Sequence, residues 1–84
     1  MYFVYVLYSP SYHKIYIGFT ADLEQRLKSH NELGKKGWTI KFRPWDLLHT
    51  EAFEDKHSAM KREKELKTAK GREFIWSLVE KLKG

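Results

Sequence analysis

The chain opens on an apolar stretch, residues 2–8 (Tyr-Phe-Val-Tyr-Val-Leu-Tyr), that contains no charged position. β-Branched and aromatic residues in an unbroken run are typical of a strand that is covered on both faces. A turn segment rich in Ser and Pro follows, and residues 14–19 return to strand composition. The two stretches together predict an antiparallel hairpin.

Helical periodicity begins after the hairpin, where the segment Thr20-Ala21-Asp22 supplies N-cap chemistry for a helix over about residues 22–32. On a helical wheel, Arg26 and His30 fall in the same arc as the leucines, one turn apart, which predicts that both face inward. Residues 34–46 are predicted to form a loop, and residues 47–53 a third strand.

Two further helices are predicted in the last third of the chain. Asp55 can cap a helix that runs to about residue 70, with Glu63 in its apolar arc and Glu65 pointing into solvent. We expect Gly71 to break this helix, because glycine is a poor helix former. Apolar positions on one side of residues 74–82 define the last helix.

The order β-β-α-β-α-α predicts an α+β fold, in which a small three-stranded mixed sheet is flanked by helices. With 84 residues, the chain is expected to form a single domain over 1–84. The absence of cysteine excludes disulfides and thiolate metal sites and favours a cytoplasmic location. The apolar start is too short for a signal peptide or a membrane span, so no membrane partner is expected.

Charge adds a preference for a polyanionic partner. The 16 basic residues exceed the 11 acidic ones, giving a net charge of +5 and a pI near 9.5. The loop over 34–46 interleaves Trp and Phe with basic residues, and its aromatic rings can either stack on unpaired bases or fold inward over the core. We expect a mixture, with at least one Trp buried. The predicted phosphate contacts are Lys35, Lys36, Lys41 and Arg43.

Five polar residues interrupt the apolar pattern: Tyr5, Tyr16, Arg26, His30 and Glu63. Two phenols, a guanidinium, an imidazole and one carboxylate can together cleave a phosphodiester with one hard metal ion. The competing interpretation is packing. A strand tyrosine is usually part of the core, an inward Arg or His is usually a structural hydrogen-bonding group, and Glu63 can pair with Arg62 or Lys67.

Other classes of site lack support in the sequence. The four histidines do not have zinc-ligand spacing, no Gly-rich phosphate loop precedes a helix, and no nucleophile-elbow pattern surrounds a serine.

Two short motifs, Phe3-Val4-Tyr5 and Tyr16-Ile17-Gly18, resemble the pair of motifs that gives the GIY-YIG nuclease family its name. Arg26 matches the family's helix arginine, His30 the histidine four residues later in some members, and Glu63 the metal-binding glutamate. The resemblance covers essentially the whole chain. It is closest to small stand-alone bacterial members related to the nuclease module of excision-repair enzymes.

Two positions depart from the family pattern. Phe3 replaces the glycine of the first motif, and Ile75 stands where many family enzymes have an asparagine, twelve residues after the glutamate.

The resemblance implies a metal-dependent DNA endonuclease that hydrolyses phosphodiester bonds, with a role in DNA repair. Glu63 would hold Mg²⁺ or Mn²⁺, and Arg26 would neutralise charge on the phosphate. Tyr5 would take the proton of an attacking water, while His30 or Tyr16 positions that water or relays the proton. Branched or damaged DNA, RNA, and a protein partner or homodimer stay open. The alternative is a non-catalytic nucleic-acid-binding or partner-binding domain.

Overall fold

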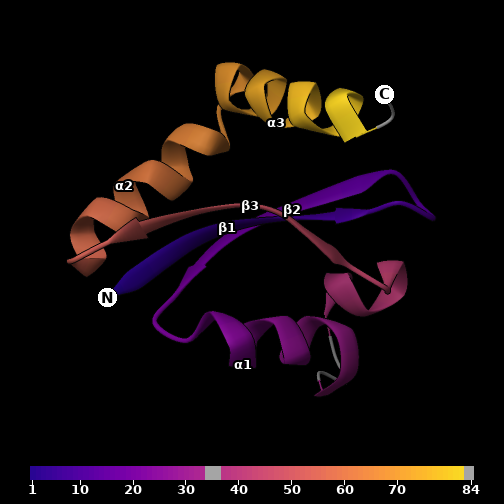
Figure 1. Cartoon of the computed structure of the whole chain (residues 1–84), viewed down its shortest axis with the longest axis horizontal. Helices are drawn as coiled ribbons and strands as arrows, with labels where there is room; N and C mark the ends of the chain where they lie inside the picture. Colours follow the sequence, from indigo (N-terminus) through magenta and orange to yellow (C-terminus); the bar gives the residue numbers. More distant parts are fainter. Residues whose placement is uncertain (34–36, 83–84) are drawn as a thin grey trace.

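The computed structural model describes residues 1–33 and 37–82, and it has the predicted order of elements. Its central layer is one sheet, with α1 on one face and α2 and α3 on the other (Figure 1). The α+β class is thereby confirmed. The elements are β1 (Tyr2–Ser9), β2 (Lys14–Thr20), α1 (Leu23–Lys28), β3 (Asp46–Phe53), α2 (Lys56–Leu66) and α3 (Ala69–Leu82).

The sheet has the strand order β2-β1-β3, and both pairings are antiparallel. The expectation of a mixed sheet is therefore wrong in this respect. The chain crosses over β1 between β2 and β3, so these two strands run in the same direction but are separated by a strand that opposes both. None of the described strands has a parallel neighbour, and β2 is left as an edge strand.

The two faces of the sheet bury different chemistry. Against α2 and α3 lies an aliphatic cluster: Val4, Val6, Ile17, Ala59, Leu66 and Ile75. Against α1 lies an aromatic cluster formed by Tyr5, Leu7 and Trp45, with Tyr16 packed on it. Alternation of side chains along β1 sends Val4 and Val6 to one face and Tyr5 and Leu7 to the other.

Both predicted N-caps are confirmed. The Asp22 carboxylate accepts a hydrogen bond from the Gln25 backbone N–H at 3.1 Å, and Asp55 accepts one from Ser58 N–H at 2.9 Å. The first helix is shorter than predicted, because a π-helical turn over Ser29–Leu33 replaces its last turn.

The predicted loop is only partly irregular. A 3-10 helix spans Trp38–Phe42, and β3 already begins at Asp46.

Gly71 does not end the second helix. The break lies at Lys67 and Thr68, and Gly71 is inside the first turn of α3, where its N–H bonds to the Thr68 hydroxyl at 3.2 Å. A Cβ at position 71 would overlap the Glu65 carbonyl oxygen and the Leu66 backbone. The glycine is therefore needed for close packing of the two helices, which its helix propensity alone does not reveal.

Among the described residues, no helix is both long and apolar enough to cross a membrane.

Candidate functional site

Tyr5 and His30 form a buried pair beneath α1. The Tyr5 hydroxyl lies 2.9 Å from His30 Nε2, and the two side chains come from β1 and the π-helical turn. Gly18, directly opposite Tyr5 in the sheet, makes this possible, because a Cβ there would lie 2.6 Å from the phenol oxygen. The glycine of the second motif thus gives the phenol of the first motif its room.

Tyr16 covers this pair on the side of β2. Its ring centroid lies 4.7 Å from that of His30 and 6.1 Å from that of Tyr5. Tyr16 also stacks with Trp38, at 6.4 Å between ring centroids and an interplanar angle of 28°, and Trp45 lies at the same distance. The structure therefore brings both motif tyrosines and the predicted histidine into one group.

The surroundings keep this pair uncharged. Burial raises the pKa of Tyr5 well above its usual value of 10.0, and the neighbouring Tyr16 adds to this more than the Arg26 charge subtracts. Burial, together with the positive charges of Arg26 and Arg43, lowers the pKa of His30 below its usual 6.5. At neutral pH the pair is a phenol beside a neutral imidazole, which has one nitrogen free to accept a proton.

The prediction that the α1 arc faces inward is confirmed for His30, which is buried, and wrong for Arg26, which is exposed. A long arginine side chain can start on an inner arc and still carry its guanidinium to water. Within the described residues, Arg26 makes no hydrogen bond or ion pair, although its charge acts on Tyr5 and His30.

Glu63 lies on the other side of the sheet, on α2, and its side chain is only 18% exposed. It forms an ion pair with Lys67 at 3.6 Å, one of the two packing partners that the sequence allowed. The other candidate, Arg62, pairs with Glu51 instead. Glu65 is exposed, as predicted.

A cleft of about 500 Å³ runs along the edge strand β2 and connects these two sides. Tyr16 and Glu63 both line it, whereas Tyr5, Arg26 and His30 do not. Tyr16 therefore separates the buried Tyr5–His30 pair from the cleft. Glu63 faces the cleft directly.

One carboxylate lines the cleft, and the described part of the chain contains no group of three or more His, Cys, Asp or Glu residues that could enclose a metal ion. Mg²⁺ fits such a site, since it keeps several waters and takes further oxygens from a substrate phosphate. Zinc, which needs three or four protein ligands, does not.

The four predicted phosphate contacts differ in whether the structure describes them and in how exposed they are. Lys35 and Lys36 lie outside the described residues, Lys41 is exposed, and Arg43 is half-buried. The Arg43 guanidinium donates to the backbone carbonyls of His30 at 2.5 Å and Ser29 at 3.1 Å. This bracing of the π-helical turn was not foreseen from the sequence.

Trp45 is buried, which confirms that at least one loop tryptophan folds inward. Its backbone N–H donates to the Asn31 side-chain oxygen at 2.6 Å, and its carbonyl accepts from the Asn31 amide at 3.0 Å. Its indole N–H donates to the Thr39 carbonyl at 2.8 Å. Asn31 was not singled out from the sequence, although an amide can satisfy both backbone groups of an irregular segment.

Several cleft residues were also missed: His13, Lys14, Lys67, Arg72 and Trp76. Arg72 and Trp76 are one turn apart on α3, and this spacing was a usable signal. The position of α3 beside the hairpin turn is a tertiary feature that the spacing does not contain.

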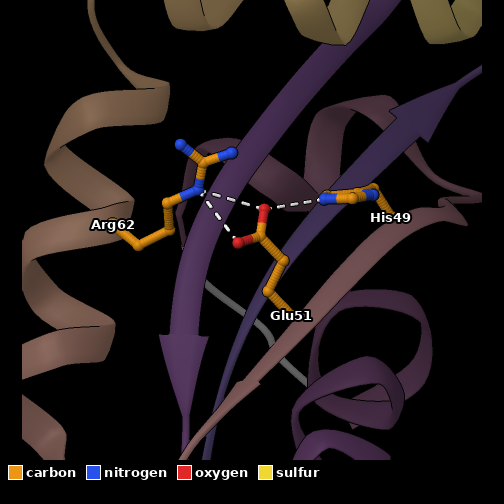
Figure 2. Close-up of polar contacts among 3 residues, drawn as sticks. All are labelled: His49, Glu51 and Arg62. Atoms are coloured by element: carbon orange, nitrogen blue, oxygen red, sulfur yellow. Dashed lines mark hydrogen bonds and ion pairs between the residues drawn. The ribbon is translucent and has the colours of Figure 1, made fainter.

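At the opposite edge of the sheet, Glu51 ties β3 to α2 (Figure 2). Its carboxylate accepts hydrogen bonds from Arg62 at 3.0 Å and from His49 at 2.8 Å. Burial raises the pKa of Glu51, but these two hydrogen bonds outweigh it and hold the pKa below its usual value. The ion pair fixes α2 one residue before Glu63.

Comparison with known proteins gives one consistent result. Residues 1–75 match the GIY-YIG catalytic domain. A UPF0213 protein of Bacillus velezensis is 41% identical over 76 residues, which cover 87% of this chain and 76% of that protein. A UPF0213 protein of Natronomonas pharaonis is 38% identical over 66 residues, covering 79% of this chain and 76% of the relative.

A solved structure agrees with these matches. The solution NMR structure of a UPF0213 protein from Bacillus halodurans superimposes with a TM-score of 0.54 at 30% identity. The alignment covers 93% of this chain and 85% of that one.

Proposed function

The chain belongs to the GIY-YIG nuclease family, and on that premise we propose that it is a metal-dependent DNA endonuclease that hydrolyses phosphodiester bonds. The observation that carries the proposal is the cleft along β2, which Tyr16 and Glu63 line together, with the buried Tyr5–His30 pair behind Tyr16. Its substrates would include branched or damaged DNA, in keeping with a role in DNA repair.

Glu63 would hold Mg²⁺ or Mn²⁺. When bound, the ion polarises the scissile phosphate and stabilises the leaving oxygen. The carboxylate already lies beside the Lys67 ammonium at 3.6 Å, so the site is adapted to a positive charge next to Glu63. With a metal ion held by Glu63, the Lys67 ammonium would be available to a phosphate oxygen.

We assign proton transfer to a relay rather than to Tyr5 alone, because the raised pKa of Tyr5 opposes its ionisation. The attacking water gives its proton to the Tyr16 hydroxyl oxygen, Tyr16 passes its own proton to Tyr5, and Tyr5 passes its own to His30 Nε2. The water becomes a hydroxide that attacks phosphorus, and the imidazole becomes an imidazolium. The lowered pKa of His30 keeps its nitrogen ready to accept at neutral pH.

Arg26 supplies the positive charge that the reacting phosphate requires. Its guanidinium is exposed and has no hydrogen bond or ion pair within the described residues, so it is open to a non-bridging oxygen. The DNA backbone would be contacted by basic residues that follow α1 in the sequence: Lys35, Lys36, Lys41 and Arg43. Arg43 would do so while bracing the π-helical turn.

One observation favours a second candidate, a nucleic-acid-binding domain that does not cut. Ile75 is fully buried in the aliphatic cluster, so the position of the family asparagine contributes no polar group here.

The two candidates separate in a cleavage assay with the purified protein on linear and branched DNA. We expect cuts with Mg²⁺ or Mn²⁺ and none with EDTA. The Arg26→Lys protein should melt at the wild-type temperature, because no described contact depends on the guanidinium, yet cut about 100-fold more slowly. DNA binding without cutting under every metal condition would leave the second candidate.

A further inference from the structure

The cleft along β2 carries aromatic rings that the proposed chemistry does not use. Trp38 is 47% exposed, with one face stacked toward Tyr16, and Trp76 lines the cleft from α3. Indoles that open onto a cleft beside a reactive carboxylate need an explanation, because large apolar side chains in a cleft usually contact a ligand.

His13 adds a third ring to those of Trp38 and Trp76, on the side of the cleft next to α3. Its ring lies 4.6 Å from that of Trp76, tilted by 39°, and its Nδ1 lies 3.0 Å from the Tyr8 hydroxyl. His13 has a φ of 55°, a conformation that a residue with a side chain rarely adopts. The Tyr8 and Trp76 contacts hold it there, so the hairpin turn presents a fixed ring to the cleft.

The charges around these rings favour an anion. Lys14, Lys67 and Arg72 line the cleft, and among the described residues Glu63 is its only lining carboxylate. A flat ring surface bordered by cations can stack a base while its phosphates meet positive charge. A double helix keeps its bases stacked on each other and offers only phosphates and groove edges to such a cleft.

We propose that this cleft binds an unpaired nucleotide, so that the protein acts on single-stranded segments of nucleic acid. The proposal rests on the proposed function, because it assigns the substrate class of the same site. Trp38 and the His13–Trp76 pair stack on bases, and Lys14, Lys67 and Arg72 contact the backbone that leads to Glu63.

The test measures binding rather than cleavage, in EDTA, by fluorescence anisotropy. The probes are a labelled single-stranded DNA of about 12 nucleotides and the same strand annealed to its complement. We expect Trp38→Ala and Trp76→Ala each to weaken binding of the single strand roughly 5- to 100-fold, with duplex binding close to wild type. The matched control is Phe74→Ala, also on α3 and 40% exposed but outside this cleft, which should change neither affinity.

Melting curves identify any variant that fails to fold, and because Trp38 is exposed on a 3-10 helix, its variant decides the question if Trp76→Ala unfolds. Equal losses on single strand and duplex, or wild-type binding of the single strand by folded Trp38→Ala, would overturn the proposal. Cleavage by the wild-type protein is scored separately with Mg²⁺. A nuclease without base stacking and a binding protein without nuclease activity therefore give different results.

Discussion

The two faces of the sheet differ in how their buried side chains are stabilised. Under α2 and α3 the fully buried core is aliphatic, beside the Tyr8, His13 and Trp76 rings, whereas the core under α1 packs two phenols, an imidazole and an indole together. The hydrophobic stabilisation from aliphatic burial is non-directional and amounts to roughly 25 cal/mol per Å². A buried phenol or imidazole needs a partner in a defined place, which Tyr5 and His30 provide for each other at 2.9 Å.

This difference separates stability from chemistry. Changes in the aliphatic cluster itself, which does not include Glu63, should alter the fraction of folded protein and leave the cleavage rate per folded molecule unchanged. Changes on the aromatic face should lower the cleavage rate of the sample by a larger factor than they lower the fraction of folded protein.

The largest effect on stability is expected from Ile75→Asn, which restores the family's asparagine. It removes a fully buried aliphatic side chain and places an amide in the aliphatic cluster, at a cost of about 3–5 kcal/mol. The matched control Ile75→Val should cost about 0.5–1.5 kcal/mol. Chemical denaturation measures both, and a stable Ile75→Asn protein that cuts faster than wild type would place Ile75 in the site instead of the core.

A smaller loss of stability, about 1–3 kcal/mol, is expected for Gly18→Ala, because its Cβ would press on the Tyr5 phenol. The displaced phenol loses its hydrogen bond to His30. The single-turnover cleavage rate should therefore fall by a larger factor than the fraction of folded protein. Gly71→Ala is the counterpart beside the aliphatic cluster, where the overlap is with the backbone at the end of α2. It should destabilise the fold while folded molecules still cut normally. Normal cleavage by Gly18→Ala would remove Tyr5 from the reaction.

The smallest effect is the pH dependence of stability. His30 has a pKa below 6.5 in the folded protein, so the unfolded chain binds a proton more readily. The His30 contribution to stability is complete above about pH 6.5 and declines as the pH falls from there toward the folded pKa. His30→Gln should flatten this decline in melting temperature, and His57→Gln, at an exposed position on α2, should not. An unchanged decline in His30→Gln would mean that His30 is not the group responsible.

The predictions that succeeded from sequence depended on local signals. Asp22 and Asp55 cap their helices, and the alternation along β1 identified Tyr5 as a residue with a reason to be buried. Family motifs supplied the grouping of residues that are far apart in the chain.

The features that were predicted wrongly or missed depend on tertiary contacts. Gly71 permits one helix to approach another, and the Arg26 side chain leaves the arc on which its Cα begins. The cleft itself arises because β2 is an edge strand that α2, α3 and the 3-10 helix all approach, and no local pattern contains this information. Trp76 and His13 are neighbours only in the folded protein.

The most direct test of the account compares two glutamates on one helix. Glu63 faces the cleft, and Glu65, two residues later, is exposed outside it. Both Glu63→Gln and Glu65→Gln should fold and bind DNA, since neither replaces a core residue. In single-turnover cleavage with Mg²⁺, Glu63→Gln should be inactive and Glu65→Gln should match the wild type. Equal rates in the two folded variants would contradict the assignment of the cleft as a metal-dependent nuclease site.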